Sequence, residues 1–369
     1  MSHCKFFKGD RPCKYYWIDR SWDCNNCEHH TTYDKRLLLI KLDELGDVVR
    51  STALVEGLKK KYKNIHLTWL VASSGKYFLQ NNPYIDRILE YDNENIRQLQ
   101  CEKFDIVINL DKDAKATSLI TTLDSEIKRG YGLSKDGHVI PLNEGTHDSY
   151  YSSLDNWGKK IKETKSYQEL IFDIAEIQYD NEKPDIFLDD GGKFKNRFYK
   201  KYNIKNTDNL IILNTGSSPK YKHRIWTKDG YRDLAQMLLK NDNNKVILTG
   251  SDIELERNKY IGKNLGVIDT TSNYNLKEFV FLLQLADLIV TGETSAMHIG
   301  IALNKKIVGF WGSLPPNLVN LFGLGKKHYL KDLDCLGCYG QFECPYNAKC
   351  MTDIKVSDVY KSIGELIWN

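Results

Sequence analysis

The stretch that most constrains the fold is residues 287–313, DLIVTGETSAMHIGIALNKKIVGFWGS, in which two apolar runs flank a polar turn. The runs at 288–290 and 307–310 show no alternation of polar and apolar residues. Such runs are typical of parallel strands that are covered on both faces. Only a short helix fits between them, so the stretch predicts a strand, a turn, a helix and a second strand of a parallel α/β sheet.

The turn at residues 292–296 carries the polar chemistry of this stretch. A helix that begins directly after a strand presents free backbone N–H groups and the positive end of its dipole. The turn is therefore a candidate phosphate site, with Glu293, Thr294 and His298 around it. The alternative is structural: Thr294 or Ser295 caps the helix, and His298 packs with one backbone hydrogen bond.

The length and charge of the chain limit the classes of protein to which it can belong. With 369 residues the chain is long for one hydrophobic core, which predicts two domains. Its 52 basic and 49 acidic residues leave a net charge of +3, so we expect no nucleic-acid partner. The N-terminus has no apolar signal region and no run of eighteen apolar residues occurs, so we predict a cytoplasmic protein.

Eight of the nine cysteines fall into two groups of four. In a reducing compartment, clustered cysteines indicate metal binding rather than disulfides. The first group has the spacing C-x8-C-x10-C-x2-C and the second, more compact, has C-x2-C-x5-C-x5-C; they are Cys4, Cys13, Cys24 and Cys27, and Cys335, Cys338, Cys344 and Cys350.

We predict that these cysteines bind structural zinc or iron, with zinc the default for four thiolates. An extension of about thirty residues cannot bury a core of its own, so a metal would supply folding free energy there. The alternative for the first group is free surface cysteines, and His3, His29 or His30 could replace one of its thiols.

Apolar runs alternate with helical patterns along most of the chain, which predicts two doubly wound, Rossmann-like α/β domains. The polar, basic stretch at 189–208 suits a linker between them. The predicted parts are an N-terminal extension (1–33), a first domain (34–205), a second domain (206–330), a cysteine loop (331–351) and an amphipathic terminal helix (352–369).

Three predicted strands of the second domain end in small polar turns. Thr215, Gly216 and Ser217 follow the strand at 209–214, with Lys222 and Arg224 close behind. Asp252 belongs to the turn after the strand at 245–249, and the third turn is that at 292–296. Because the carboxyl ends of parallel strands share one edge, these turns favour a ligand site over a purely structural role.

Two features of the first domain have competing interpretations. Asp47 stands at the start of a predicted helix, where Asp is a favoured N-cap. Asp111 and Asp113 form a D-x-D triplet after the strand at 104–110, which could bind a divalent metal. Two carboxylates make a weak metal site, so we favour a solvated loop for this triplet.

Several motifs, in this order, resemble glycosyltransferase family 9, the heptosyltransferases. Residues 37–58, LLLIKLDELGDVVRSTALVEGL, are similar to the family's opening strand, Gly-Asp turn and helix. Residues 215–226 resemble its diphosphate loop, basic residue and Trp, and residues 293–298 resemble its Asp-Thr-Gly-x-x-His donor motif. FWGS at 310–313 matches the succeeding Gly turn, and the resemblance covers residues 36 to about 367. The chain departs from the motifs with Arg224, Glu293 and Ser295 in place of Lys, Asp and Gly.

The resemblance implies a GT-B architecture, in which two Rossmann-like domains face each other across a cleft. The first would hold mainly the acceptor and the second the nucleotide-sugar donor, with Asp47 as general base. The donor would be held by Thr215, Gly216, Ser217, Lys222, Arg224, Asp252, Glu293, Thr294, Ser295 and His298. This geometry would place Asp47 and His298 in one interdomain cleft.

The chemistry of sugar transfer agrees with this set of residues. Helix N-termini with Arg224 or Lys222 can stabilise a departing nucleoside diphosphate without a divalent ion. One in-line displacement, with Asp47 taking the proton of the attacking hydroxyl, inverts the anomeric centre. The expected enzyme is therefore an inverting, divalent-metal-independent transferase.

The resemblance implies an ADP-activated heptose as donor and a lipopolysaccharide sugar, another surface glycan or a protein hydroxyl as acceptor. The second cysteine group resembles the iron-binding cysteines of transferases that heptosylate autotransporter adhesins, which adds weight to a protein acceptor. Peripheral association with the inner membrane and oligomerisation are compatible with these expectations.

Two other functions compete with this one. The altered donor motif would also suit a non-catalytic module that binds a nucleotide or a partner. A nicotinamide-dependent enzyme ranks last, because no G-x-G-x-x-G follows the first strand, which ends at Ile40.

Overall fold

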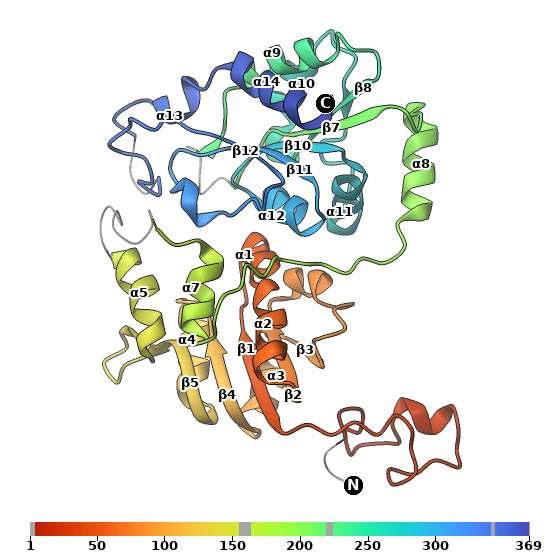
Figure 1. The fold of residues 1–369 in the computed structure, drawn as a ribbon, viewed down its shortest axis with the longest axis vertical. Helices are drawn as coiled ribbons and strands as arrows, with labels where there is room; N and C mark the ends of the chain where they lie inside the picture. The colour runs from red at the N-terminus through yellow and green to blue at the C-terminus, as the bar shows by residue number, and fades with distance from the viewer. Residues whose placement is uncertain (1–3, 155–163, 219–223, 341–343, 369) are drawn as a thin grey trace. The chain divides into compact units, whose positions relative to one another are not determined.

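The computed structural model describes residues 4–154, 164–218, 224–340 and 344–368 (Figure 1). The chain divides into two compact units. The first consists of Met1–Glu44, Ser51–Tyr150 and Gln168–Glu182, and the second of Leu45–Arg50, Tyr151–Tyr167 and Lys183–Asn369. The short helix α1 (Leu45–Ser51) thus lies almost wholly within the second unit, although its neighbours in sequence belong to the first.

The first unit is built on a six-stranded sheet with the order β3-β2-β1-β4-β5-β6. The strands are parallel except β6, which runs antiparallel to β5. Their bounds are β1 (Lys35–Ile40), β2 (Ile65–Val71), β3 (Arg87–Glu90), β4 (Lys103–Asn109), β5 (Asp124–Leu133) and β6 (Val139–Pro141).

Helices alternate with these strands, as the sequence predicted. They are α2 (Ala53–Lys61), α3 (Asn93–Gln100), α4 (Ala114–Thr122), α5 (His147–Leu154) and α7 (Tyr167–Ile174), with 3-10 turns η1 (Lys14–Trp17), η2 (Ser73–Phe78) and η3 (Glu144–Thr146). Asp92 and Asp113 cap α3 and α4 by accepting hydrogen bonds from backbone N–H groups of the first turn.

The N-terminal cysteine segment is attached at the amino edge of the first sheet. Lys5 Nζ donates to the Ile65 carbonyl at 2.9 Å and lies 3.2 Å from the Asp86 carboxylate. The Asp34 N–H donates to the Asn64 carbonyl. Residues 64, 65 and 86 stand where β2 and β3 begin, so this segment lies away from the carboxyl edge at which ligands bind in such sheets.

The second unit holds a parallel six-stranded sheet with the order β12-β11-β10-β7-β8-β9. The strands are β7 (Asn209–Asn214), β8 (Asn244–Thr249), β9 (Ile268–Asp269), β10 (Leu288–Gly292), β11 (Lys306–Phe310) and β12 (Gly325–His328). Together the two sheets confirm the predicted pair of doubly wound α/β units.

Besides α1, the described part of the second unit contains the helices α8 (Gly192–Tyr202), α9 (Lys228–Leu238), α10 (Leu255–Gly262), α11 (Leu276–Leu285), α12 (Ser295–Ala302), α13 (Lys349–Thr352) and α14 (Val356–Ile367). It also contains the 3-10 turns η5 (Asp252–Glu254) and η6 (Pro316–Leu318). No helix among the described residues is both long and apolar enough to cross a lipid bilayer.

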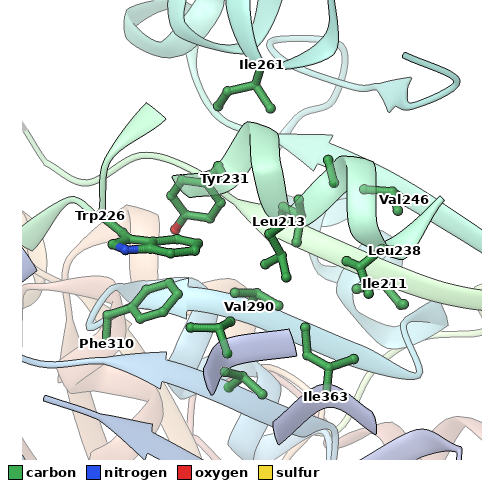
Figure 2. Packing of buried hydrophobic residues seen from close by; sticks show 14 of the residues in the cluster. Ile211, Leu213, Trp226, Tyr231, Leu238, Val246, Ile261, Val290, Phe310 and Ile363 are labelled. Atoms are coloured by element: carbon green, nitrogen blue, oxygen red, sulfur yellow. The ribbon is translucent and has the colours of Figure 1, made fainter. Parts of the chain in front are cut away.

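The terminal helix α14 is part of the second unit's core, as its amphipathic pattern predicted. Its Val359 and Ile363 are fully buried in a cluster that packs one face of the sheet against α9, α10 and α14 (Figure 2). In the same cluster the Trp226 ring packs 4.6 Å from that of Phe310, and its indole N–H donates to the Ile354 carbonyl. The predicted boundaries between domains stay predictions.

Candidate active site

The second sheet has its topological switch point between β7 and β10. β7 pairs with β8 on one side and β10 on the other, with Asn214 opposite Thr291. The connections diverge from these two strands, and α/β proteins bind ligands at the carboxyl ends of strands at such a point. The turn that begins at Thr215 and the turn that holds Glu293 both open at this point.

Asn214, the last residue of β7, ties the two turns together. Its Nδ2 donates to Thr291 Oγ1 at 3.0 Å and to Thr294 Oγ1 at 3.2 Å. Thr294 occupies the N-cap position of α12, but its side chain makes no capping hydrogen bond. The first N–H groups of α12 are therefore not used by that hydroxyl, contrary to the structural alternative in which Thr294 caps the helix.

The loop after β7 is held from within. Thr215 is buried and its Oγ1 donates to Asn258 Oδ1 at 2.5 Å, so this hydroxyl positions the loop. Gly216 lies against Glu254, because a Cβ added there would come within 2.3 Å of the Glu254 side chain. Glu254 accepts hydrogen bonds from Ser251 N at 2.8 Å and Ser251 Oγ at 2.7 Å, which completes a capping box. Asp252 is exposed at the start of η5.

Glu293 is the centre of a buried charged cluster. Its Oε2 accepts a hydrogen bond from Arg224 Nη1 at 3.1 Å. Its Oε1 lies 3.6 Å from His298 Nε2 and 3.9 Å from Arg50 Nη1. The Glu293 side chain is 7% exposed, so the guanidinium groups offset the desolvation of its charge.

Helix α1 contributes the charged residues Asp47 and Arg50 to this cluster, and Gly46 packs beside them. Asp47 is the third residue of the helix, so the expectation that it would be the N-cap was wrong. Its Oδ1 lies 2.9 Å from Arg50 Nη2. Gly46 packs on His298, since a Cβ added there would come within 2.7 Å of His298 Cδ2. Asp47 and His298 are thereby gathered in one cluster of the second unit.

Two tyrosines border Arg50. The Arg50 Cζ lies 3.6 Å from the centroid of the Tyr167 ring, which is a close cation–π contact. Burial opposes the charge on Arg50, but Asp47, Tyr167, Glu293 and Tyr339 together raise the pKa of the guanidinium. Burial also raises the pKa of Tyr339, on which the charges of Arg50, Glu293 and Arg224 act.

The structure brings most of the predicted donor residues to one edge of the second sheet, around the ends of β7 and β10. They are Thr215, Gly216, Ser217, Arg224, Glu293, Thr294, Ser295 and His298. Lys222 lies outside the described residues. The sequence interpretation missed Arg50, Tyr167, Asn214, Glu254 and Tyr339; a polar residue that ends an apolar strand was a usable signal only for Asn214.

The D-x-D triplet is occupied by structural contacts. Asp111 is buried, bonds to Lys41 Nζ and accepts from Leu42 N at 2.6 Å. Asp113 accepts from the N–H groups of Lys115 and Ala116 as the cap of α4. The expectation of a solvated loop was thus wrong for Asp111, whose carboxylate fixes the carboxyl end of β1 to that of β4.

The second cysteine group gathers near the carboxyl end of β11. The Gly337 N–H donates to the Gly312 carbonyl, and a Cβ added at Gly312 would come within 2.5 Å of Cys350 Sγ. Burial, followed by the charges of Cys335, Cys338 and Cys344, raises the pKa of the Cys350 thiol to about 11. Within the described ranges, however, no three or more His, Cys, Asp or Glu side chains are arranged to hold a metal ion.

Comparisons with known proteins agree with this architecture. Lipopolysaccharide heptosyltransferase 1 from Campylobacter coli is 22% identical over 362 residues, 90% of this chain and 98% of the relative. The solved structure of a family 9 glycosyl transferase from Veillonella parvula matches with a TM-score of 0.71 at 20% identity, over 90% of this chain and 97% of that one.

A more distant structural match is TibC from enterotoxigenic Escherichia coli, a dodecameric iron-containing heptosyltransferase solved in complex with ADP-D-beta-D-heptose. It superposes with a TM-score of 0.56 at 13% identity, over 91% of this chain and 77% of TibC. The profile of glycosyltransferase family 9 (heptosyltransferase) matches residues 94–345, more than half of the chain. The chain therefore belongs to glycosyltransferase family 9 and is a glycosyltransferase.

Proposed function

We propose that this protein transfers heptose from ADP-heptose to an acceptor hydroxyl, with inversion at the anomeric carbon and without a catalytic divalent ion. The observation that carries the proposal is the cluster at the switch point, where Arg224, Glu293, His298 and Asp47 are gathered beside the start of α12. Relatives named for ADP-heptose or heptosyl transfer support the choice of donor.

The donor diphosphate would lie over the turns that follow β7 and β10. Gly216 and Ser217 would approach it from the first turn, and Ser295 with the N–H groups of α12 from the second. Arg224 and Lys222 would add positive charge, and Asp252 would stand near the nucleoside. Leaving-group charge can then be stabilised by preorganised donors, so no divalent ion is required.

Asp47 would act as the general base on the acceptor hydroxyl. As the hydroxyl oxygen attacks the anomeric carbon, its proton passes to an Asp47 carboxylate oxygen and the bond to the ADP oxygen breaks. One displacement of this kind inverts the configuration at the anomeric carbon. The contact with Arg50 would hold the Asp47 carboxylate in one orientation before the acceptor arrives.

The acceptor would be a surface glycan or a protein hydroxyl. Relatives named as lipopolysaccharide heptosyltransferases favour a glycan, whereas the resemblance of the second cysteine group to that of transferases that heptosylate autotransporter adhesins favours a protein. We expect the protein to act in the cytoplasm. Peripheral association with the inner membrane and oligomerisation are compatible with either acceptor.

The two cysteine groups would hold structural zinc or iron. The second group has the better fit, because burial and then the charges of neighbouring cysteines of the group raise the pKa of Cys335 and of Cys350, and Cys350 packs against the turn that follows β11. A bound ion would stabilise the loop between β12 and α14. For Cys4, Cys13, Cys24 and Cys27 the support is their spacing and their place in a short segment at the amino edge of the first sheet.

The decisive experiment is to incubate the purified protein with ADP-heptose and candidate acceptors in the presence of EDTA, and to identify products by mass spectrometry. We expect a heptosylated acceptor with inverted anomeric configuration and release of ADP. Binding of ADP-heptose by calorimetry without its consumption by any acceptor or by water would contradict the proposal.

A further inference from the structure

Arg50 joins two carboxylates that come from distant parts of the chain. Its Nη2 lies 2.9 Å from Asp47 Oδ1 and its Nη1 3.9 Å from Glu293 Oε1. The Tyr167 ring covers one face of the guanidinium at 3.6 Å. The group is therefore fixed between a carboxylate of α1, a carboxylate of the donor turn and an aromatic face.

The charges in this cluster alternate in sign. Asp47 is followed by Arg50, then Glu293, then Arg224, whose Nη1 donates to Glu293 Oε2. Because Oε1 faces Arg50 and His298 while Oε2 faces Arg224, both oxygens of Glu293 are engaged. An aspartate at this position would be one methylene shorter and could not keep both contacts.

Packing alone does not require this arrangement. Val48 and Val49 of α1 are fully buried and already anchor the helix by apolar contact. A buried ion pair stabilises a fold no better than an apolar pair of similar volume, so its presence beside a candidate base points to a role in positioning.

We propose that Arg50 is a positioning residue for the transfer step, which holds the Asp47 carboxylate in its reactive orientation and links it through Glu293 to the donor turn. This inference rests on the proposed function of Asp47 and of the turn. It also assigns a reason for glutamate at position 293, because the longer side chain completes the link to Arg50.

Steady-state kinetics test the positioning role. We expect Arg50→Gln to lower kcat by about 30-fold while the KM for ADP-heptose changes less than about 3-fold. Arg50→Lys should retain part of kcat, since it keeps the charge but not the two nitrogens that reach Asp47 and Glu293 separately. The acid limb of the kcat profile should move to higher pH in Arg50→Gln, because Asp47 loses a cation. The other groups that act on Arg50 are Glu293, Tyr167 and Tyr339, and Glu293 is in turn faced by Arg224 and His298.

Arg87 provides a matched control. It forms a partly buried two-pronged pair with Glu102 at 2.8 and 2.9 Å, at the beginning of β3. Arg87→Gln should lower Tm without moving kcat or the acid limb. If Arg50→Gln behaves in the same way, Arg50 is structural and the inference is overturned.

Hydrogen exchange tests the link without requiring turnover. We expect ADP to slow amide exchange of residues 45–50 in the unaltered protein, and this protection to be lost in Arg50→Gln and in Glu293→Asp. Glu293→Asp keeps the negative charge, so this variant tests the link even if Arg50→Gln does not fold. If ADP protects residues 45–50 but the protein consumes no ADP-sugar, the proposed function is refuted, while the link from Arg50 through Glu293 to the donor turn still stands. If the protein turns over ADP-heptose but ADP protects residues 45–50 equally in Arg50→Gln and Glu293→Asp, the link is refuted and the proposed function stands.

Discussion

Arg224 and Glu293 meet through a hydrogen bond of 3.1 Å between Nη1 and Oε2, with side chains only 14% and 7% exposed. Arg224 stands just before α9, and Glu293 stands between β10 and α12. The pair thus connects the two turns that open at the switch point of the second sheet. It also holds a cation close to the place where we expect the donor diphosphate.

We expect Arg224→Gln to raise the KM for ADP-heptose by about 10- to 100-fold, since a cation near the diphosphate is removed. The Tm should also fall, because Glu293 loses a partner while buried. Arg224→Lys should recover most of the binding. Calorimetry with ADP measures the change, and unaltered affinity in Arg224→Gln would mean that the diphosphate binds elsewhere.

Asp47→Asn should lower kcat by about 100-fold or more, because the amide cannot accept a proton from the acceptor. Its effect on Tm should be small, since Asp47 is about a third exposed and Arg50 keeps Glu293 nearby. The measurement is product formation at saturating donor and acceptor. Normal turnover would remove Asp47 from the mechanism.

Gly46→Ala places a methyl group where Gly46 now packs on His298. We expect a loss of about 1–3 kcal/mol in stability and a lower kcat, because α1 or His298 must shift. Gly266→Ala is the control: Gly266 is exposed and a Cβ there meets nothing within 4 Å. Thermal melts of both variants decide the point, and equal melting temperatures would show that α1 does not pack on His298.

Elemental analysis should find zinc or iron bound to the purified protein. Cys338→Ser and Cys350→Ser should each remove one bound ion and lower Tm. Cys101→Ser should change neither, since Cys101 is exposed and belongs to neither group. Full stability and no metal in the unaltered protein would leave these thiols as ordinary free cysteines.

Acid should destabilise the first unit through His66 on β2. Burial lowers the pKa of His66 from 6.5 to about 4, although Asp86 acts in the opposite direction. Between those two values the unfolded chain binds a proton that the folded chain does not, so stability falls as pH decreases from about 6.5 towards 4. Denaturant titrations should show a loss on the order of 2 kcal/mol over that window, allowing for partial solvent exposure.

His66→Gln should flatten this pH dependence, while the same change at the exposed His138 should leave it intact. An unchanged slope in His66→Gln would assign the effect to another group.

The doubly wound fold could be predicted because its signals are local. Unbroken apolar runs such as 288–290 and 307–310 became β10 and β11, and the terminal amphipathic stripe became α14. The gathering of the polar turns at one edge followed from parallel pairing alone.

The charged cluster could not be predicted from the sequence, because it depends on contacts between segments that are far apart. Arg50 is a polar interruption in an otherwise apolar helical stripe, and the sequence does not say that it faces Glu293, 243 positions away. The cap expected at Asp47 failed because α1 begins two residues earlier. Asp111 was misjudged because its partner Lys41 follows a different strand.

The second cysteine group lies in a loop whose two ends are already fixed, by β12 in the sheet and by α14 in the core. Bringing distant cysteines together around an ion costs conformational entropy of the chain between them. Because folding of the second unit already fixes both ends of this loop, much of that entropy is lost before an ion binds. If the loop holds an ion, as we propose, it should bind that ion more tightly and release it more slowly than the same cysteines would in a flexible peptide. Metal exchange should accordingly be limited by local opening of α14 rather than by encounter with a chelator.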